Sequence, residues 1–76
     1  MYNNTFYKEL SDYLTNAIDR DSDEQMTSYL TESFQISNET SYEIVKDFIQ
    51  KFSKVPIPLE VDVLELLKRH LVESKQ

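Results

Sequence analysis

Apolar residues recur every three to four positions along most of the chain, which is the spacing of one face of an α-helix. Four such segments follow one another, and short polar or proline-containing breaks separate them. Their predicted bounds are residues 4–19, 23–35, 39–53 and 58–74. Because short connections favour antiparallel neighbours, the pattern predicts an all-α protein, a compact antiparallel bundle of four short helices in one domain, residues 1–76.

The first three predicted helices have one apolar stripe each and a polar opposite side. Tyr7 and Tyr42 lie at the margins of their stripes and are therefore expected at the surface, whereas Tyr13 and Tyr29 are expected at the edge of the core. Ser11 falls on the polar side. Tyrosine is enriched where proteins meet, so Tyr7 and Tyr42 are candidate interface residues.

Side chains that can cap helices mark the predicted starts, since the chain contains no glycine. Residues 22–25, Ser-Asp-Glu-Gln, predict a capping box at the second helix. Thr40 with Glu43 offers a second box for the third helix, and an earlier start capped by Ser37 or Asn38 is also open. Asn38 is in addition a candidate left-handed residue at a helix end.

The last segment differs from the others because apolar residues lie on two of its sides. Pro58 suits the first helical position, although the alternation of apolar residues over 55–63 is also compatible with a strand. Val61, Leu64 and Val72 fall opposite the main stripe. A helix that is apolar nearly all round is either central in its bundle or shared with another chain. These three residues therefore predict a homodimer contact, unless they are covered internally.

Negative charge is concentrated in one part of the sequence. The formal net charge is −6, and residues 21–43 contain six acidic and no basic residues. This band predicts an acidic surface, with Glu32, Glu39 and Glu43 as candidate contacts that would steer a basic partner protein.

Composition excludes most catalytic chemistry. Without glycine the chain cannot form a phosphate-binding P-loop or a dinucleotide fingerprint, and without cysteine it has no thiol nucleophile, disulfide or thiolate metal site. The spacing of Asp19, Asp21 and Asp23 matches the start of a calcium loop, but Glu24 and Leu30 stand where such a loop needs glycine and glutamate. His70 lies on an apolar stripe and is interpreted as structural. We therefore predict no enzyme activity, no cofactor and no metal site.

No signal peptide or run of apolar residues long enough for a membrane span is visible, so the expected location is cytoplasmic. The sequence as a whole favours a small acidic protein-binding module that acts as regulator, inhibitor or adaptor. In size, charge and expected fold it is similar to the small acidic helical immunity proteins that block bacterial nucleases, although that family's paired-tyrosine motif is absent. The acidic band admits a sharper form of this function, in which the protein masks the basic nucleic-acid-binding surface of its partner, as those proteins do.

Two alternatives remain open. The second and third helices could form a helix-turn-helix with residues 40–51 as recognition helix, but DNA binding needs cations where this chain places acids. The bases that could serve it are Lys46, Lys51, Lys54, Lys68 and Arg69. The other alternative is a structural subunit of a larger assembly, from a phage or mobile element.

Overall fold

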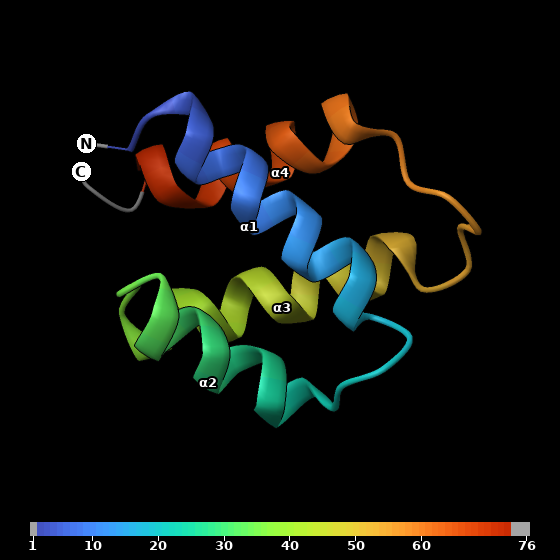
Figure 1. Cartoon of the computed structure of the whole chain (residues 1–76), viewed down its shortest axis with the longest axis horizontal. Helices are drawn as coiled ribbons and strands as arrows, with labels where there is room; N and C mark the ends of the chain where they lie inside the picture. Colours follow the sequence, from blue (N-terminus) through green and yellow to red (C-terminus); the bar gives the residue numbers. More distant parts are fainter. Residues whose placement is uncertain (1, 74–76) are drawn as a thin grey trace.

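The computed structural model describes residues 2–73, and this part of the chain contains four α-helices and no strand (Figure 1). They are α1 (Asn4–Ala17), α2 (Asp23–Ser33), α3 (Asn38–Phe52) and α4 (Glu60–Glu73). The prediction of an all-α, four-helix bundle is confirmed.

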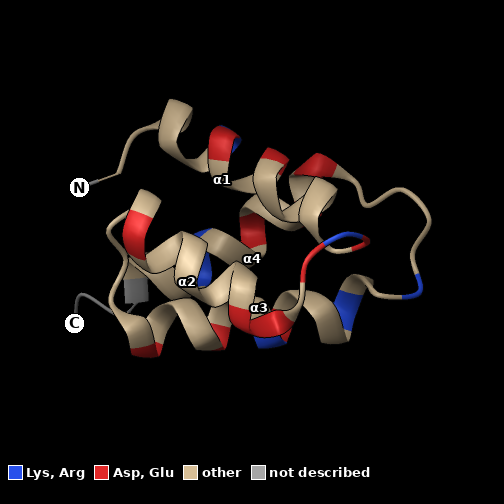
Figure 2. Ribbon diagram, turned by 60° about the horizontal axis from the view of Figure 1, so that its bottom comes forward, with Lys and Arg blue, Asp and Glu red and all other residues tan. Residues whose placement is uncertain are grey.

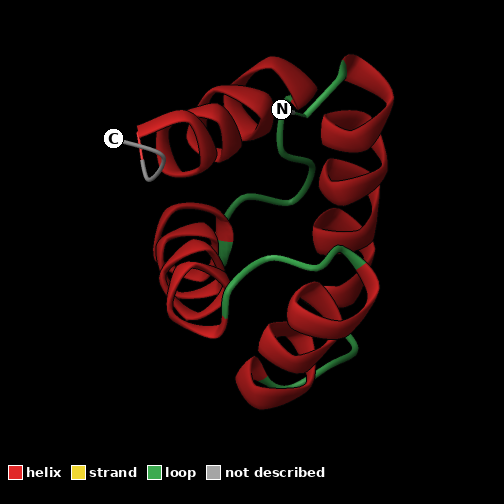
Figure 3. Ribbon diagram, turned by 90° about the vertical axis from the view of Figure 1, so that its left-hand side faces the viewer, coloured by secondary structure: helices red, strands yellow, loops and turns green. Residues whose placement is uncertain are grey.

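Each helix packs mainly on its neighbours in a ring. The helices α2 and α3 form an antiparallel hairpin, and α4 packs against both α1 and α3. As a result, α2 and α4 lie on opposite sides of the molecule with α1 and α3 between them (Figure 1). Viewed from the side, the four helices surround a common interior (Figure 3).

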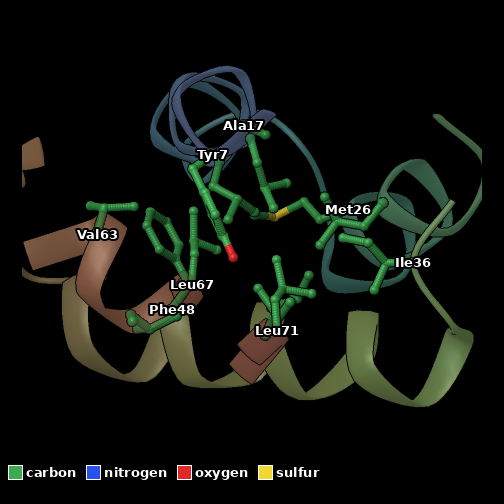
Figure 4. Packing of buried hydrophobic residues seen from close by; sticks show 14 of the residues in the cluster. Tyr7, Ala17, Met26, Ile36, Phe48, Val63, Leu67 and Leu71 are labelled. Atoms are coloured by element: carbon green, nitrogen blue, oxygen red, sulfur yellow. The ribbon is translucent and has the colours of Figure 1, made fainter. Parts of the chain in front are cut away.

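One apolar stripe from every helix meets in this interior (Figure 4). Leu14 of α1, Met26 of α2, Phe48 of α3 and Leu67 of α4 are completely buried. Burying a side chain of this size stabilises the fold by about 1.5–3 kcal/mol. Ile36, in the turn between α2 and α3, is also part of the core. A chain of this length has no other core to rely on.

The buried side of α1 is displaced from the predicted one, and the prediction that Tyr7 lies at the surface is wrong. Tyr7 is only 6% exposed, and Ser11, which was expected on the polar side, is buried as well. The reason is the position of α4. Its Lys68 Nζ lies 5.6 Å from the centre of the Tyr7 ring, so α4 covers a side of α1 that periodicity alone marks as a margin.

The turn between α2 and α3 is tightened by a left-handed residue. That residue is Gln35, with φ 56°, and not Asn38 as expected. The turn lets the Ile36 N–H donate to the Leu30 carbonyl at 3.3 Å and directs the Ile36 side chain into the core. The hydroxyl of the fully buried Ser41 then donates to the Ile36 carbonyl, also at 3.3 Å. The polar groups of this turn are thereby satisfied inside the protein.

Helix starts agree with the sequence at α2 and differ at α3. The capping box of α2 is confirmed: the Gln25 N–H donates to Ser22 Oγ, and the Ser22 N–H donates to the Gln25 side chain. At α3 the box of Thr40 and Glu43 does not form. Ser37 caps the helix instead and accepts from the Thr40 N–H at 3.2 Å, so the earlier of the two proposed starts is the observed one.

The last helix begins at Glu60, so the prediction that Pro58 is its first residue is wrong. The Leu59 carbonyl accepts the first helical bonds, from the Asp62 and Val63 N–H groups. Residues 55–59 are non-helical, and Ile57 is 81% exposed. An additional turn would bury little apolar surface, and short helices depend on such packing for their stability.

The capping assignment at α3 predicts different effects for two neighbouring substitutions. Ser37→Ala removes the side chain that satisfies the Thr40 N–H and should lower the free energy of unfolding by about 1 kcal/mol. Thr40→Ala should cost less than about 0.5 kcal/mol, since Thr40 is not the cap. Urea unfolding followed by circular dichroism measures both. A larger loss for Thr40→Ala than for Ser37→Ala would contradict the observed start.

Candidate protein-binding surfaces

One surface of the molecule carries uncompensated negative charge. We call it the acidic face; acidic positions occur along both α2 and the first half of α3 (Figure 2). All of its carboxylates are exposed, and no lysine or arginine occurs between residues 21 and 45. The ion pairs within the described residues involve other carboxylates, on Asp21, Asp47 and Glu60. The acidic face comprises Asp23, Glu24, Glu32, Glu39 and Glu43.

Two exposed tyrosine rings stand among these carboxylates. Tyr42 is 55% exposed, in agreement with the prediction, and Tyr29 is also exposed although it was expected at the edge of the core. Shallow hollows surround both rings: Glu24 and Glu32 help to line the one at Tyr29, and Asp23 and Glu24 the one at Tyr42. Carboxylates and aromatic faces both attract guanidinium and ammonium groups. The hollow at Tyr29 is therefore suited to a basic side chain. At Tyr42 the chain's own Lys46 already places its Nζ 6.0 Å from the ring centre, which shows that this ring accepts an ammonium group.

The Tyr29 ring is held in place from behind by α1. It stacks on Tyr13, with ring centres 4.0 Å apart and planes inclined by 15°. The Tyr13 hydroxyl in turn donates to Asp21 Oδ2 at 3.1 Å, and Arg20 Nε donates to the other oxygen of the same carboxylate at 3.2 Å. Burial, and after it the hydrogen bond to Asp21, raises the pKa of Tyr13 to about 12. The stack fixes one exposed ring of the acidic face.

The aspartates that match the start of a calcium loop are not brought together. Asp21 is engaged with Tyr13 and Arg20, and Asp23 lies in the first turn of α2. Among residues 2–73 there is no group of three histidine, cysteine, aspartate or glutamate residues placed to hold a metal ion. His70 is half-buried, and its Nε2 lies 2.9 Å from Asp47 Oδ2, so it joins α4 to α3.

A second surface is the side of α4 that faces away from the core. Val61 is 68% exposed and Val72 50%, whereas Leu64 is half-buried and packs against the core. A hollow lies along this side, lined by Val61, Leu64, Glu65 and Lys68. Five of the seven exposed large apolar side chains described belong to residues 55–72. The second apolar side of the last helix is thus left largely uncovered by the rest of the chain.

The structure divides the predicted interface residues into separate groups. Glu32, Glu39, Glu43 and Tyr42 lie on the α2–α3 side, while Val61, Leu64 and Val72 lie on α4; Tyr7 belongs to the core.

Sequence reasoning missed three members of the α2–α3 surface. The position of Asp23 and Glu24 in the charged band was a usable signal. For Tyr29 there was none, because its exposure follows from how α1 and α2 pack.

Comparison of the chain with protein-family models, with curated proteins and with solved structures finds no match. Within the described residues, no helix has the length and apolar character needed to cross a membrane.

The raised pKa of Tyr13 predicts a pH dependence of stability. A pKa above the ordinary value of 10.0 means that the folded state holds the proton more tightly than the unfolded chain does. This stabilisation is complete below pH 10 and is lost as the pH rises through about 12. Tyr13→Phe should lower the free energy of unfolding by about 1 kcal/mol at pH 7, because the hydrogen bond to Asp21 is lost.

Denaturant unfolding of both proteins in a series from neutral to strongly alkaline pH measures this effect. The wild type should lose stability more steeply than Tyr13→Phe above pH 10. All other ionisable groups are the same in the two proteins, so the difference isolates Tyr13. Parallel curves would contradict the assignment.

Proposed function

We propose that this protein is a small non-enzymatic protein-binding module whose acidic face binds a basic surface of another protein, as a regulator, inhibitor or adaptor. The observation that supports the proposal is the set of five exposed carboxylates on α2 and α3 without ion-pair partners among the described residues. Two exposed tyrosine rings stand among them.

Repulsion between neighbouring carboxylates favours such a partner. Exposed charges act on one another over a screening length of about 8 Å at physiological salt, and the carboxylates of the acidic face have no ion-pair partner among the described residues. A basic surface that approaches the face replaces repulsion with attraction. The same field accelerates the encounter, because oppositely charged patches steer diffusing proteins together.

The two tyrosines supply contact area that contributes affinity, which exposed carboxylates alone do not. An exposed ion pair is worth only about 0–1 kcal/mol, so charge by itself gives steering more than affinity. Tyr29 and Tyr42 add rigid apolar area with a polar tip, which is the composition of interface centres. Arginine fits this combination best, because its guanidinium pairs with carboxylates and also stacks on aromatic rings.

Two parts of the acidic face are held by contacts within the protein. The box of Ser22 and Gln25 fixes the start of α2, and the Tyr13 stack fixes one ring. Little freedom is then lost on association, which is a main cost of binding. The same helices would have to approach DNA in a helix-turn-helix, and their carboxylates would repel its phosphates. The face therefore supports binding to a protein.

Two charge variants with the same net charge test the proposal. The first is the triple substitution Glu32→Lys, Glu39→Lys and Glu43→Lys on the acidic face. The control places the same change outside it, at the exposed residues Glu9, Asp12 and Asp19. Each substitution adds two charges, so three of them bring the net charge from −6 to 0 in both variants.

Affinity capture from the source organism, followed by identification of the proteins retained, should recover a basic protein with the wild type and the control. The acidic-face variant should bind that protein roughly 100-fold less tightly, at about 1 kcal/mol for each reversed contact. Both variants should keep the wild-type melting temperature within a few degrees. Equal retention by all three proteins, or equal loss by both variants, would show that the acidic face is not the binding surface.

A further inference from the structure

The outermost side chains of α4 form a single line. Val61, Glu65, Lys68 and Val72 are all exposed and are spaced by four, three and four residues. With 3.6 residues per turn these positions lie one above another on one side of the helix. The opposite side carries the buried residues Val63, Leu66, Leu67 and Leu71. We call the four exposed residues the outer line of α4.

The order of residue types along the outer line is the same in both directions, except that the two central charges exchange sign. In order it is apolar, acidic, basic and apolar. If a second α4 lies antiparallel to the first, with a two-fold axis between Leu66 and Leu67, Val61 faces Val72 of the partner subunit. Glu65 then faces Lys68 of the partner subunit, and the same pairs form again on the other side of the axis.

We propose that the outer line of α4 is a homodimer interface in which two copies of this chain pair their α4 helices antiparallel. An interface with two-fold symmetry must be complementary to itself, and the outer line meets that condition in both charge and apolar character. The inference goes beyond the proposed function, which concerns only the acidic face. It does not depend on the basic partner.

The position of α4 in the fold permits such a contact between two negatively charged chains. The acidic face belongs to α2 and α3, and α2 lies on the far side of the molecule from α4 (Figure 1). Pairing through α4 therefore keeps the most acidic helix of each copy away from the other copy. Residues 60–72 of α4 carry three acids and two bases in near balance: Glu60, Asp62 and Glu65 against Lys68 and Arg69.

The size of the contact sets its expected strength. The 14 residues of α4 span about 21 Å, and a pair of such helices falls near or below the roughly 1,200 Å² at the lower end of stable interfaces. Ile57 and Leu59, which precede α4 in the chain, are exposed as well. We therefore expect a dimer that dissociates on dilution.

Sedimentation of the wild type over micromolar to millimolar concentrations should show reversible assembly to twice the chain mass of 9.0 kDa. Glu65→Lys alone and Lys68→Glu alone should both be monomeric, because like charges then face each other across the axis. The double exchange Glu65→Lys with Lys68→Glu should restore the dimer. A mixture of the two single variants should also form a heterodimer, since each supplies the charges that the other needs.

This design separates pairing from effects on the fold. Lys68→Glu removes the contact of Lys68 with the Tyr7 ring, but the double exchange removes it too and should nevertheless dimerise. Circular dichroism should match the wild type for every variant, because both positions are exposed. The melting temperature should fall by a few degrees and by the same amount in Lys68→Glu and in the double exchange, since both lose the contact with Tyr7.

Disulfide cross-linking shows whether the two α4 helices run antiparallel. Because the chain contains no cysteine, only the introduced cysteines can form a disulfide. A mixture of Val61→Cys and Val72→Cys should oxidise to the mixed disulfide. Val61→Cys alone should not, because the two copies of residue 61 lie about 16 Å apart along an antiparallel pair, far beyond disulfide reach.

A wild type that stays at 9.0 kDa throughout, or single variants that neither the double exchange nor mixing rescues, would overturn the proposal. Capture of another protein on α4 by a wild type that remains monomeric would overturn it as well. The acidic-face variant should dimerise like the wild type, so failure of this inference and failure of the proposed function give different results.

Discussion

Each of the four helices can turn only one side toward a core that they surround together, and this constraint governs the rest of the structure. The core takes one stripe from every helix, and in a ring of four no helix is enclosed by the others. A second apolar side has no place inside the chain. This is why Val61 and Val72 remain at the surface although the last helix is apolar on two sides, and why Leu64, at the edge of that side, is only half-buried.

The contact between α1 and α2 shows how core packing shapes the surface that is proposed to bind a partner. Aromatic rings bridge the two helices, with Phe6 edge-on to Phe34 at 5.5 Å and Tyr13 stacked on Tyr29 at 4.0 Å. Rings of this size fill the space between the helices and leave the outer face of Tyr29 exposed. The same contacts that stabilise the bundle thus hold an aromatic side chain among the carboxylates of α2.

The two surfaces differ in chemistry because they belong to different parts of the charge pattern. Residues 21–43 carry the whole excess of acid, so the surface of α2 and the start of α3 repels its own kind and suits a basic protein. The exposed side of α4 combines both signs of charge with valines, the combination on which the proposed pairing of two copies rests. A pair of chains joined at α4 would present two acidic faces outward, and two linked sites can raise the apparent affinity for a partner with two basic patches.

The sequence by itself determined the four helices, the capping box at Ser22, the acidic band and the two apolar sides of the last helix. These features follow from local spacing, local hydrogen bonds and composition. Only the tertiary structure decided that Tyr7 is buried, that Ser37 and not Thr40 caps α3, and that α4 starts at Glu60. Periodicity defines the apolar stripe of a helix but not which neighbouring helix covers the margin of that stripe. Where two residues could each cap a helix, the packing of the preceding turn selects between them, as the turn around Ile36 does for α3.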